Sequence, residues 1–385
     1  MKEQEKEEEE KQKKYIPVYK KGYRSKTYHP KNSHSFFSIK HKNKKYLSKT
    51  QQNKKIIKHY DKVLVFDLDE TLGSFSELQW IWNAMTNYSH SKESQKSLHS
   101  QKAILKTLID IYPEFLRPGI LHILEYLAQK KKKGECIAIF IYTNNQHPPP
   151  WTECIIDYFN QYIEEKTNNR PFFDQIIPAF KIGQEKIEWM RTSNDKSYED
   201  FIKCSILPKH TEICFVDNTY FHSMIHPKVY YIQPKSYQHT LSIQDTIDRF
   251  IFAETSGILD EFFPIAISSF PSASSFLFFS NTTQSQKQTR KIMVRKFIEQ
   301  TMEQFVHNKQ LRLQQSLKNN SITIKPTPLI QNTAQQNLEI INIDLYVSQK
   351  LLDFIREFFI LTTYSHILTR KYKPITEITD LKTTT

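Results

Sequence analysis

Two aspartates lie two positions apart, directly after an unbroken apolar run. Residues 63–66 read Val-Leu-Val-Phe, and Asp67 and Asp69 follow them. An apolar run without alternation predicts a strand buried on both faces, as in the middle of a parallel sheet. Side chains two positions apart in an extended segment point to the same side. Two carboxylates placed in this way predict a site for a hard cation such as Mg²⁺. The simpler alternative is a strand end whose acids are only solvated.

Other apolar runs also end in polar side chains. One run ends at Thr143 and Asn144, and another ends at Asp217 and Asn218. In open α/β sheets, ligands bind in the crevice beyond the carboxyl ends of the strands. We therefore expect these side chains to lie beside Asp67. The predicted strands cover residues 63–66, 135–145, 172–180, 212–218 and 229–234.

Segments with helical periodicity separate these strands. The sequence therefore predicts an α/β fold, with a Rossmann-like parallel sheet flanked by helices. Residues 74–116 form an insertion after the first strand, with helical stretches near 78–85 and at 103–111. The remaining predicted helices cover 115–134, 152–163, 198–204, 239–262, 288–316 and 345–366, and a polar linker covers 317–337.

The sequence DLDETL at 67–72 resembles the first motif of the haloacid dehalogenase superfamily, in the DxDxT form used by its phosphatases. Glu70, and Arg-Pro-Gly at 117–119 before a helix, resemble the branch that contains the RNA polymerase II C-terminal-domain phosphatases. The resemblance implies a haloacid dehalogenase-type catalytic domain over 59–245, with 74–116 as a small helical cap. A mostly helical C-terminal extension then covers 246–385.

The resemblance also implies a role for each polar group. Asp67 would be the nucleophile that forms an aspartyl-phosphate, and Asp69 the general acid and base. Thr143 would bind the transferring phosphoryl group. The implied phosphate-binding residues are Thr71, Thr143, Asn144, Lys196 and Lys203, and the implied ligands of Mg²⁺ are Asp67, Asp69, Asp217 and Asn218.

The resemblance further implies a lysine, upstream of Asp217, that screens the nucleophile from the phosphate dianion. Lys196 lies 21 residues before Asp217 and precedes a predicted helix and turn. Lys203 lies 14 residues before Asp217, which is closer to the spacing in the polymerase-tail phosphatases, but it would sit within that helix. Lys209 is a third candidate. We favour Lys196 over Lys203.

The basic charge of the chain is concentrated near its start. The formal net charge is +13, and residues 11–60 hold sixteen Lys or Arg and no Asp or Glu. Like charges at this density repel, so residues 1–58 are predicted to be a disordered basic arm. Residues 11–58 could contact nucleic acid or an acidic protein, or could simply act as a solubilising tail.

Cysteine usage and hydropathy indicate the compartment. The four cysteines show no spacing suited to zinc. We expect them to be small buried side chains, in a protein that resides in a reducing compartment. No signal peptide or bilayer span is expected. These features predict a soluble intracellular protein, in the nucleus or cytoplasm, without a membrane partner.

Three functions remain open at this point. The first is a Mg²⁺-dependent phosphatase that acts on Ser/Thr phosphoproteins, similar to the polymerase-tail enzymes. The second is a polynucleotide 3′-phosphatase, which the basic arm favours. The third is a catalytically silent protein that keeps the fold as a docking module.

Overall fold

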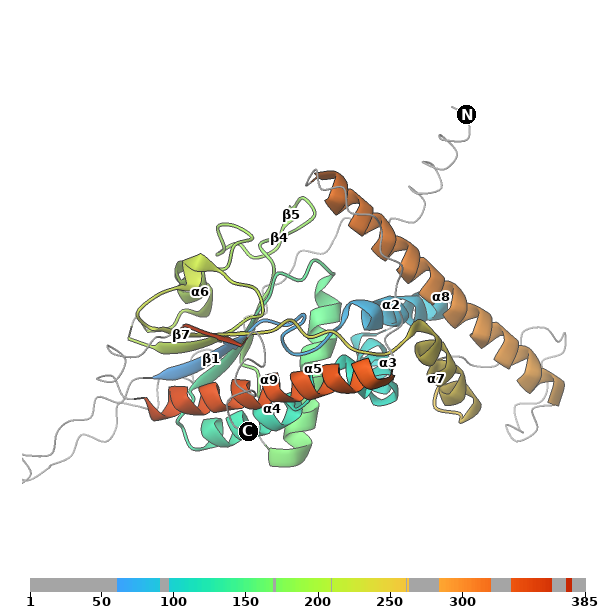
Figure 1. The fold of residues 1–385 in the computed structure, drawn as a ribbon, viewed down its shortest axis with the longest axis horizontal. Coiled ribbons are helices and arrows are strands. Elements are labelled where there is room, and N and C mark those ends of the chain that lie inside the picture. Colours follow the sequence, from blue (N-terminus) through green and yellow to red (C-terminus); the bar gives the residue numbers. More distant parts are fainter. Residues whose placement is uncertain are drawn as a thin grey trace, which may run out of the picture. The chain divides into compact units, whose positions relative to one another are not determined.

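The computed structural model divides after residue 57, and its second unit, Lys58–Thr385, is compact. The arm expected at 1–58 lies outside the described residues, as do Lys209 and most of the expected linker at 317–337. Every helix and strand described below belongs to the second unit (Figure 1). The structure describes residues 61–90, 97–168, 171–208, 210–260, 262, 284–319, 334–361 and 372–375.

A parallel sheet of six strands forms the centre of this unit, in the order β3-β2-β1-β6-β7-β8. Each neighbouring pair of strands is parallel. The prediction of an α/β fold with a Rossmann-like parallel sheet is therefore confirmed. The strands are β1 (Lys62–Phe66), β2 (Ala138–Tyr142), β3 (Gln175–Ile177), β6 (Glu212–Val216), β7 (Val229–Pro234) and β8 (Tyr372–Ile375).

The two faces of β1 are buried in different clusters, which explains its unalternated apolar sequence. Leu64 and Phe66 belong to a large cluster with side chains of most of the helices. Val63 and Val65 belong to a second cluster, which includes Phe201 of the helix α6. All four strand residues are fully buried. A strand with helices on both faces has no polar side, so its apolar residues do not alternate.

Helices cover both faces of the sheet, with α6 on one face and α4, α5 and α9 on the other (Figure 1). A short antiparallel hairpin follows β3, formed by β4 (Lys181–Ile182) and β5 (Glu185–Lys186). The helices are α2 (Ser76–His90), α3 (Leu98–Ile111), α4 (Ile120–Lys132), α5 (Pro149–Thr167), α6 (Tyr198–Ser205), α7 (Ile243–Thr255), α8 (Gln284–Asn319) and α9 (Ala334–Ile360), with short 3-10 turns at Pro113–Phe115 and His222–Met224.

The insertion expected at 74–116 forms the two helices α2 and α3. Helix α2 packs on α3 and α8, and α3 packs on α5 and α7. Trp82 of α2 contacts Trp151 of α5, with ring centroids 5.2 Å apart. The helices of the insertion therefore extend the helical layer beside the sheet, where Trp82 is a core residue and Trp80 is partly buried against the same cluster.

The described part of the C-terminal region packs against the same sheet. Helix α8 contacts α2 and α7, and α9 contacts β7 and β8. The Nζ atom of Lys62, the first residue of β1, donates to backbone carbonyls at the end of α9, at 2.6 Å from Phe358 and 2.9 Å from Leu361. The boundary expected at residue 245 therefore lies inside one compact unit, and the C-terminal helices complete its core.

Several boundaries differ from the sequence predictions. The strand expected at 172–180 is only Gln175–Ile177, and the sixth strand, β8, was not predicted. Helix α9 starts at Ala334, eleven residues before its expected start at 345. Strand β8 contains Pro374 and pairs only with β7. Tertiary pairing creates this short edge strand, and local sequence carries little signal for it.

Within the part of the chain that the structure describes, no helix is both long enough and apolar enough to span a bilayer.

Candidate active site

Three of the expected site residues lie one position beyond three parallel strands, where they extend the ladder. The backbone N–H of Asp67 donates to the carbonyl of Val216, at 2.9 Å, and that of Asp217 donates to Ile232, at 3.2 Å. The N–H of Thr143 donates to Ile177, at 3.0 Å. The sheet therefore fixes the backbone of these residues and brings them to one edge, as the sequence predicted from the polar ends of the strands.

A tight turn follows Asp67 and returns the chain toward the sheet. Glu70 has a positive φ of 60°, and its N–H donates to the carbonyl of Gly73 at 2.7 Å. A Cβ atom at Gly73 would lie 2.4 Å from the carbonyl oxygen of Phe115, a separation that side chains do not tolerate. The glycine is therefore required by close backbone packing, and it lets the first motif fold back beside the sheet.

Lys196 joins the acids of the first and fourth predicted strands. Its Nζ atom lies 2.5 Å from Oδ1 of Asp67 and 2.6 Å from Oδ2 of Asp217. The side chains of Lys196 and Asp217 are each 1% exposed. Burial opposes the ammonium charge, but Asp217 and Asp67 outweigh this effect and hold the pKa of Lys196 above its usual value. The lysine therefore remains charged and neutralises part of the acidic cluster.

The same cluster holds more negative charge than Lys196 compensates. Burial, reinforced by the neighbouring carboxylate of Asp67, raises the pKa of Asp69 to about 7. Burial also raises the pKa of Asp217 to about 7, despite the contact with Lys196. Of the three acids, Asp69 is the one without a hydrogen bond to Lys196 among the described residues, so it is suited to carry a proton.

Thr71 and Asn218 connect the first motif to the end of β6. The hydroxyl of Thr71 donates to Oδ1 of Asn218 at 2.9 Å, and it accepts from the N–H of Asn218 at 3.1 Å. It also lies 3.4 Å from Oδ2 of Asp67. Thr71 is fully buried. This pair therefore fixes the loop that carries Asp67 relative to the loop after Asp217.

The residues after β2 divide between two roles. Thr143 is buried, and its Oγ1 accepts from the backbone N–H of Asn145 at 3.0 Å. The side chain of Asn144, an expected phosphate ligand, accepts from Arg191 at 2.7 Å and donates to the carbonyl of Asn194 at 2.8 Å. Asn144 therefore bonds to the segment before Lys196, and within the described part of the chain its side chain makes no hydrogen bond to the acids.

Lys203 is not part of the cluster. It lies on α6, its side chain is 52% exposed, and its nearest acidic partner is Asp200 of the same helix, at 3.5 Å. Its expected role in binding phosphate stays a prediction that these contacts do not support, whereas Lys196 reaches both acids from the loop before α6. The side chain of Ser197 caps α6 by accepting from the N–H of Asp200, so the helix begins after Lys196.

Sequence reasoning did not identify three groups that shape the site, the buried Arg117 and Arg191 and the half-buried Asn145. Asn145 donates from Nδ2 to Oδ2 of Asp69 at 2.7 Å. Arg191 donates to the carbonyl of Thr143 at 3.0 Å. Arg117, noticed only as part of Arg-Pro-Gly, donates to the carbonyls of Thr71 at 2.7 Å and of Glu70 at 2.6 Å. A buried arginine in a loop leaves no periodic signal, so only the tertiary contacts reveal these roles.

The donor set suits a hard divalent cation. Asp67 and Asp217 share the single ammonium group of Lys196, and Asp69 adds a third carboxyl group that does not bond to it. Carboxylate and carbonyl oxygens are the ligands that Mg²⁺ prefers. Burial, with a further contribution from the neighbouring carboxylate of Asp67, raises the pKa values of Asp69 and Asp217. Among the described residues, no group of three His, Cys, Asp or Glu side chains is arranged so that it could hold a metal ion as it stands. The fit therefore rests on ligand type and on charge.

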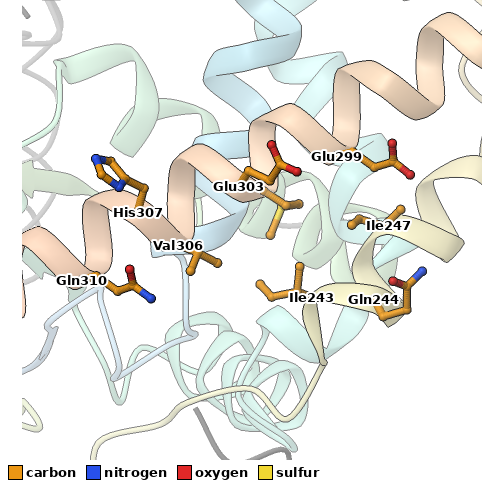
Figure 2. A pocket seen from close by; sticks show the side chains of 9 residues that line it. Ile243, Gln244, Ile247, Glu299, Glu303, Val306, His307 and Gln310 are labelled. Carbon is orange, nitrogen blue, oxygen red and sulfur yellow. The ribbon is translucent and has the colours of Figure 1, made fainter. Parts of the chain in front are cut away.

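A separate groove of about 500 Å³ lies between α7 and α8 (Figure 2). Ile243 and Ile247 of α7 face Val306 of α8 across it, and Glu299 and Glu303 lie along its α8 side. All of its lining residues come from these two helices. The groove is therefore a feature of helix packing, separate from the acidic cluster.

Comparison with known proteins gave no relative: no family model matches the sequence, and no curated protein matches it.

Proposed function

We propose that the chain is a Mg²⁺-dependent phosphomonoester hydrolase that works through an aspartyl-phosphate. The observation that carries the proposal is the contact of one buried ammonium, Lys196, with both Asp67 and Asp217, at 2.5 and 2.6 Å. Asp69, two residues from Asp67, supplies a carboxyl group with a pKa near neutrality. A nucleophile, a cation and a proton donor at one sheet edge are the groups that phosphoryl transfer requires.

In the first step a carboxylate oxygen of Asp67 attacks the phosphorus atom of the ester. A bond forms between Asp67 and phosphorus while the bond from phosphorus to the ester oxygen breaks. The electron pair of that bond passes to the leaving oxygen, which takes a proton from Asp69. Lys196 and Thr143 stabilise negative charge on the phosphoryl oxygens, where phosphoryl transfer needs it.

In the second step Asp69, now ionised, accepts a proton from water as the water oxygen attacks phosphorus. The bond between Asp67 and phosphorus breaks and its electron pair returns to the Asp67 carboxylate, which releases inorganic phosphate. Asp69 ends the cycle protonated, as it began. The two acids take different roles because Asp67 accepts a hydrogen bond from Lys196, which Asp69 lacks, and because burial raises the pKa of Asp69 to about 7.

Mg²⁺ would be held by Asp67, Asp217, Asn218 and the backbone carbonyl of Asp69, and when bound it supplies positive charge at the phosphoryl group. The side chain of Asn218 is already oriented by Thr71, so a second residue of the first motif helps to form this site. Lys196 complements the ion because it reaches the same two carboxylates from the loop before α6.

We assign the substrate class as Ser/Thr phosphoproteins, the class suggested by the DLDETL and Arg-Pro-Gly resemblance. The alternative of a polynucleotide 3′-phosphatase depends on the charge of residues 11–58, which lie outside the described residues. A silent docking module would not explain the buried, ion-paired acids. Burying charged groups costs stability unless they are compensated, and a catalytic role accounts for that cost.

The test compares Mg²⁺-dependent hydrolysis of phosphoserine and phosphothreonine peptides, 3′-phosphorylated oligonucleotides and p-nitrophenyl phosphate. Asp67→Asn should abolish turnover, because an amide is not a competent nucleophile. Lys196→Met should also abolish it, whereas Lys203→Met, a matched loss of an exposed lysine, should retain it. Turnover by Asp67→Asn, or no turnover of any substrate by the intact chain with Mg²⁺, would overturn the proposal.

A further inference from the structure

Asn145 contacts both of the loops that carry the proposed chemistry. Its Nδ2 donates to Oδ2 of Asp69 at 2.7 Å. Its backbone N–H donates to the Oγ1 of Thr143 at 3.0 Å. Its Oδ1 accepts from the backbone N–H of His147 at 2.9 Å. One side chain after β2 is therefore fixed at both ends of its amide, and it holds the acid that follows β1.

These contacts settle which way the amide points. A backbone N–H can only donate, so the atom of the Asn145 amide that faces His147 must be the oxygen. The amide nitrogen then faces Asp69, and the Asp69 oxygen that receives it acts as an acceptor. The orientation follows from a donor whose role is not ambiguous.

We infer that Asn145 is a positioning residue that selects the oxygen of Asp69 which delivers the proton to the leaving group. Asn145 makes Oδ2 an acceptor, so the proton of the neutral carboxyl group sits on Oδ1. Among the described residues, Oδ1 of Asp69 makes no hydrogen bond, so it is open to a leaving oxygen. The inference rests on the proposed function, because it assigns a task within the same two-step reaction.

The role has a chemical signature that a purely structural role lacks. The serine oxygen of a phosphoserine ester leaves as an alkoxide unless it is protonated. Cleavage of this substrate therefore depends strongly on a correctly positioned general acid. The p-nitrophenolate group leaves readily without a proton. A residue that positions the acid therefore changes the hydrolysis rate of the phosphoserine ester much more than that of p-nitrophenyl phosphate. A residue that only maintains the fold changes both rates equally.

The decisive variants are Asn145→Ala and Asn145→Asp. Asn145→Ala removes the donor. Asn145→Asp keeps the size of the side chain and an acceptor for His147, but it replaces the donor to Asp69 by a carboxyl group, so it guards against simple loss of folding. Gln146→Ala is the matched control, because this neighbouring amide is exposed and donates to the backbone carbonyl of Asn144.

The readout is the ratio of kcat for a phosphoserine peptide to kcat for p-nitrophenyl phosphate, measured with Mg²⁺ on the full chain. Aligned general acids contribute about a hundredfold or more, so we expect this ratio to fall by about tenfold or more in both Asn145 variants. The ratio should be unchanged in Gln146→Ala. Equal loss on both substrates, in variants with unchanged circular dichroism, would overturn the inference. An intact chain that hydrolyses neither substrate would overturn the proposed function instead.

Discussion

Neutralising Asp69 should stabilise the ion-free protein at alkaline pH, although it should abolish or severely lower activity. Burial and the carboxylate of Asp67 raise the pKa of Asp69 from 3.8 to about 7. Because the folded state holds this proton more tightly than the unfolded state, stability is highest below the unfolded pKa and falls as pH rises through the folded one. Above about pH 7, the folded protein must carry an unfavourable buried charge.

The magnitude follows from the size of the shift. One pKa unit corresponds to about 1.4 kcal/mol, so the shift from 3.8 to about 7 corresponds to a penalty of about 4 kcal/mol at alkaline pH. Asn has the same shape without the charge, and its carbonyl can still accept from Asn145. We therefore expect Asp69→Asn to raise the free energy of unfolding by up to about 4 kcal/mol near pH 8, and by little near pH 4.

The assay is urea unfolding followed by circular dichroism, with a chelator present, at about pH 4 and about pH 8. Asp353→Asn is the matched control, because Asp353 is 46% exposed and should change stability by less than about 0.5 kcal/mol. If Asp69→Asn is no more stable than the wild type near pH 8, or gains equally at both pH values, the electrostatic account of the cluster is wrong.

Three further changes test other parts of the structure. Mg²⁺ at about a hundred times its dissociation constant should raise the free energy of unfolding by about 2.7 kcal/mol, and Asp217→Asn should lose most of this gain, as urea titrations with and without the ion will show. Lys62→Met should cost about 2 kcal/mol in the same assay, because three backbone carbonyls at the end of α9 lose a charged donor; an unchanged midpoint would contradict the capping role. Gly73→Ala should cost about 2–3 kcal/mol, because its Cβ would lie 2.4 Å from the carbonyl oxygen of Phe115, and a melting temperature equal to the wild type would argue against that close packing.

The sheet was predictable because its central strands are apolar on both faces. Val63 and Val65 face one cluster, and Leu64 and Phe66 face the other. A strand of this kind stands out in a sequence without any tertiary information. Strand β8 does not, because it contains Pro374 and forms only by pairing with the edge of β7. The early start of α9 at Ala334 was missed because its first turns are polar.

The acids of the site were predictable for a related reason. Parallel strands end at one edge, so Asp67 and Asp217 had to meet there once both strands were identified. The choice between Lys196 and Lys203 could not be settled by spacing alone, since it depends on where α6 begins. Asn145 was missed in favour of its neighbour Asn144, because the turn after β2 decides which amide faces the acids.

The central claim is that Asp67 becomes phosphorylated during turnover. The most direct measurement is mass spectrometry of acid-quenched protein after brief mixing with Mg²⁺ and a phosphoserine peptide. We predict one added phosphoryl group on the fragment that contains Asp67, labile to base, with no adduct in Asp67→Asn. Steady turnover with an unmodified Asp67 fragment, or an adduct on a different residue, would contradict the account.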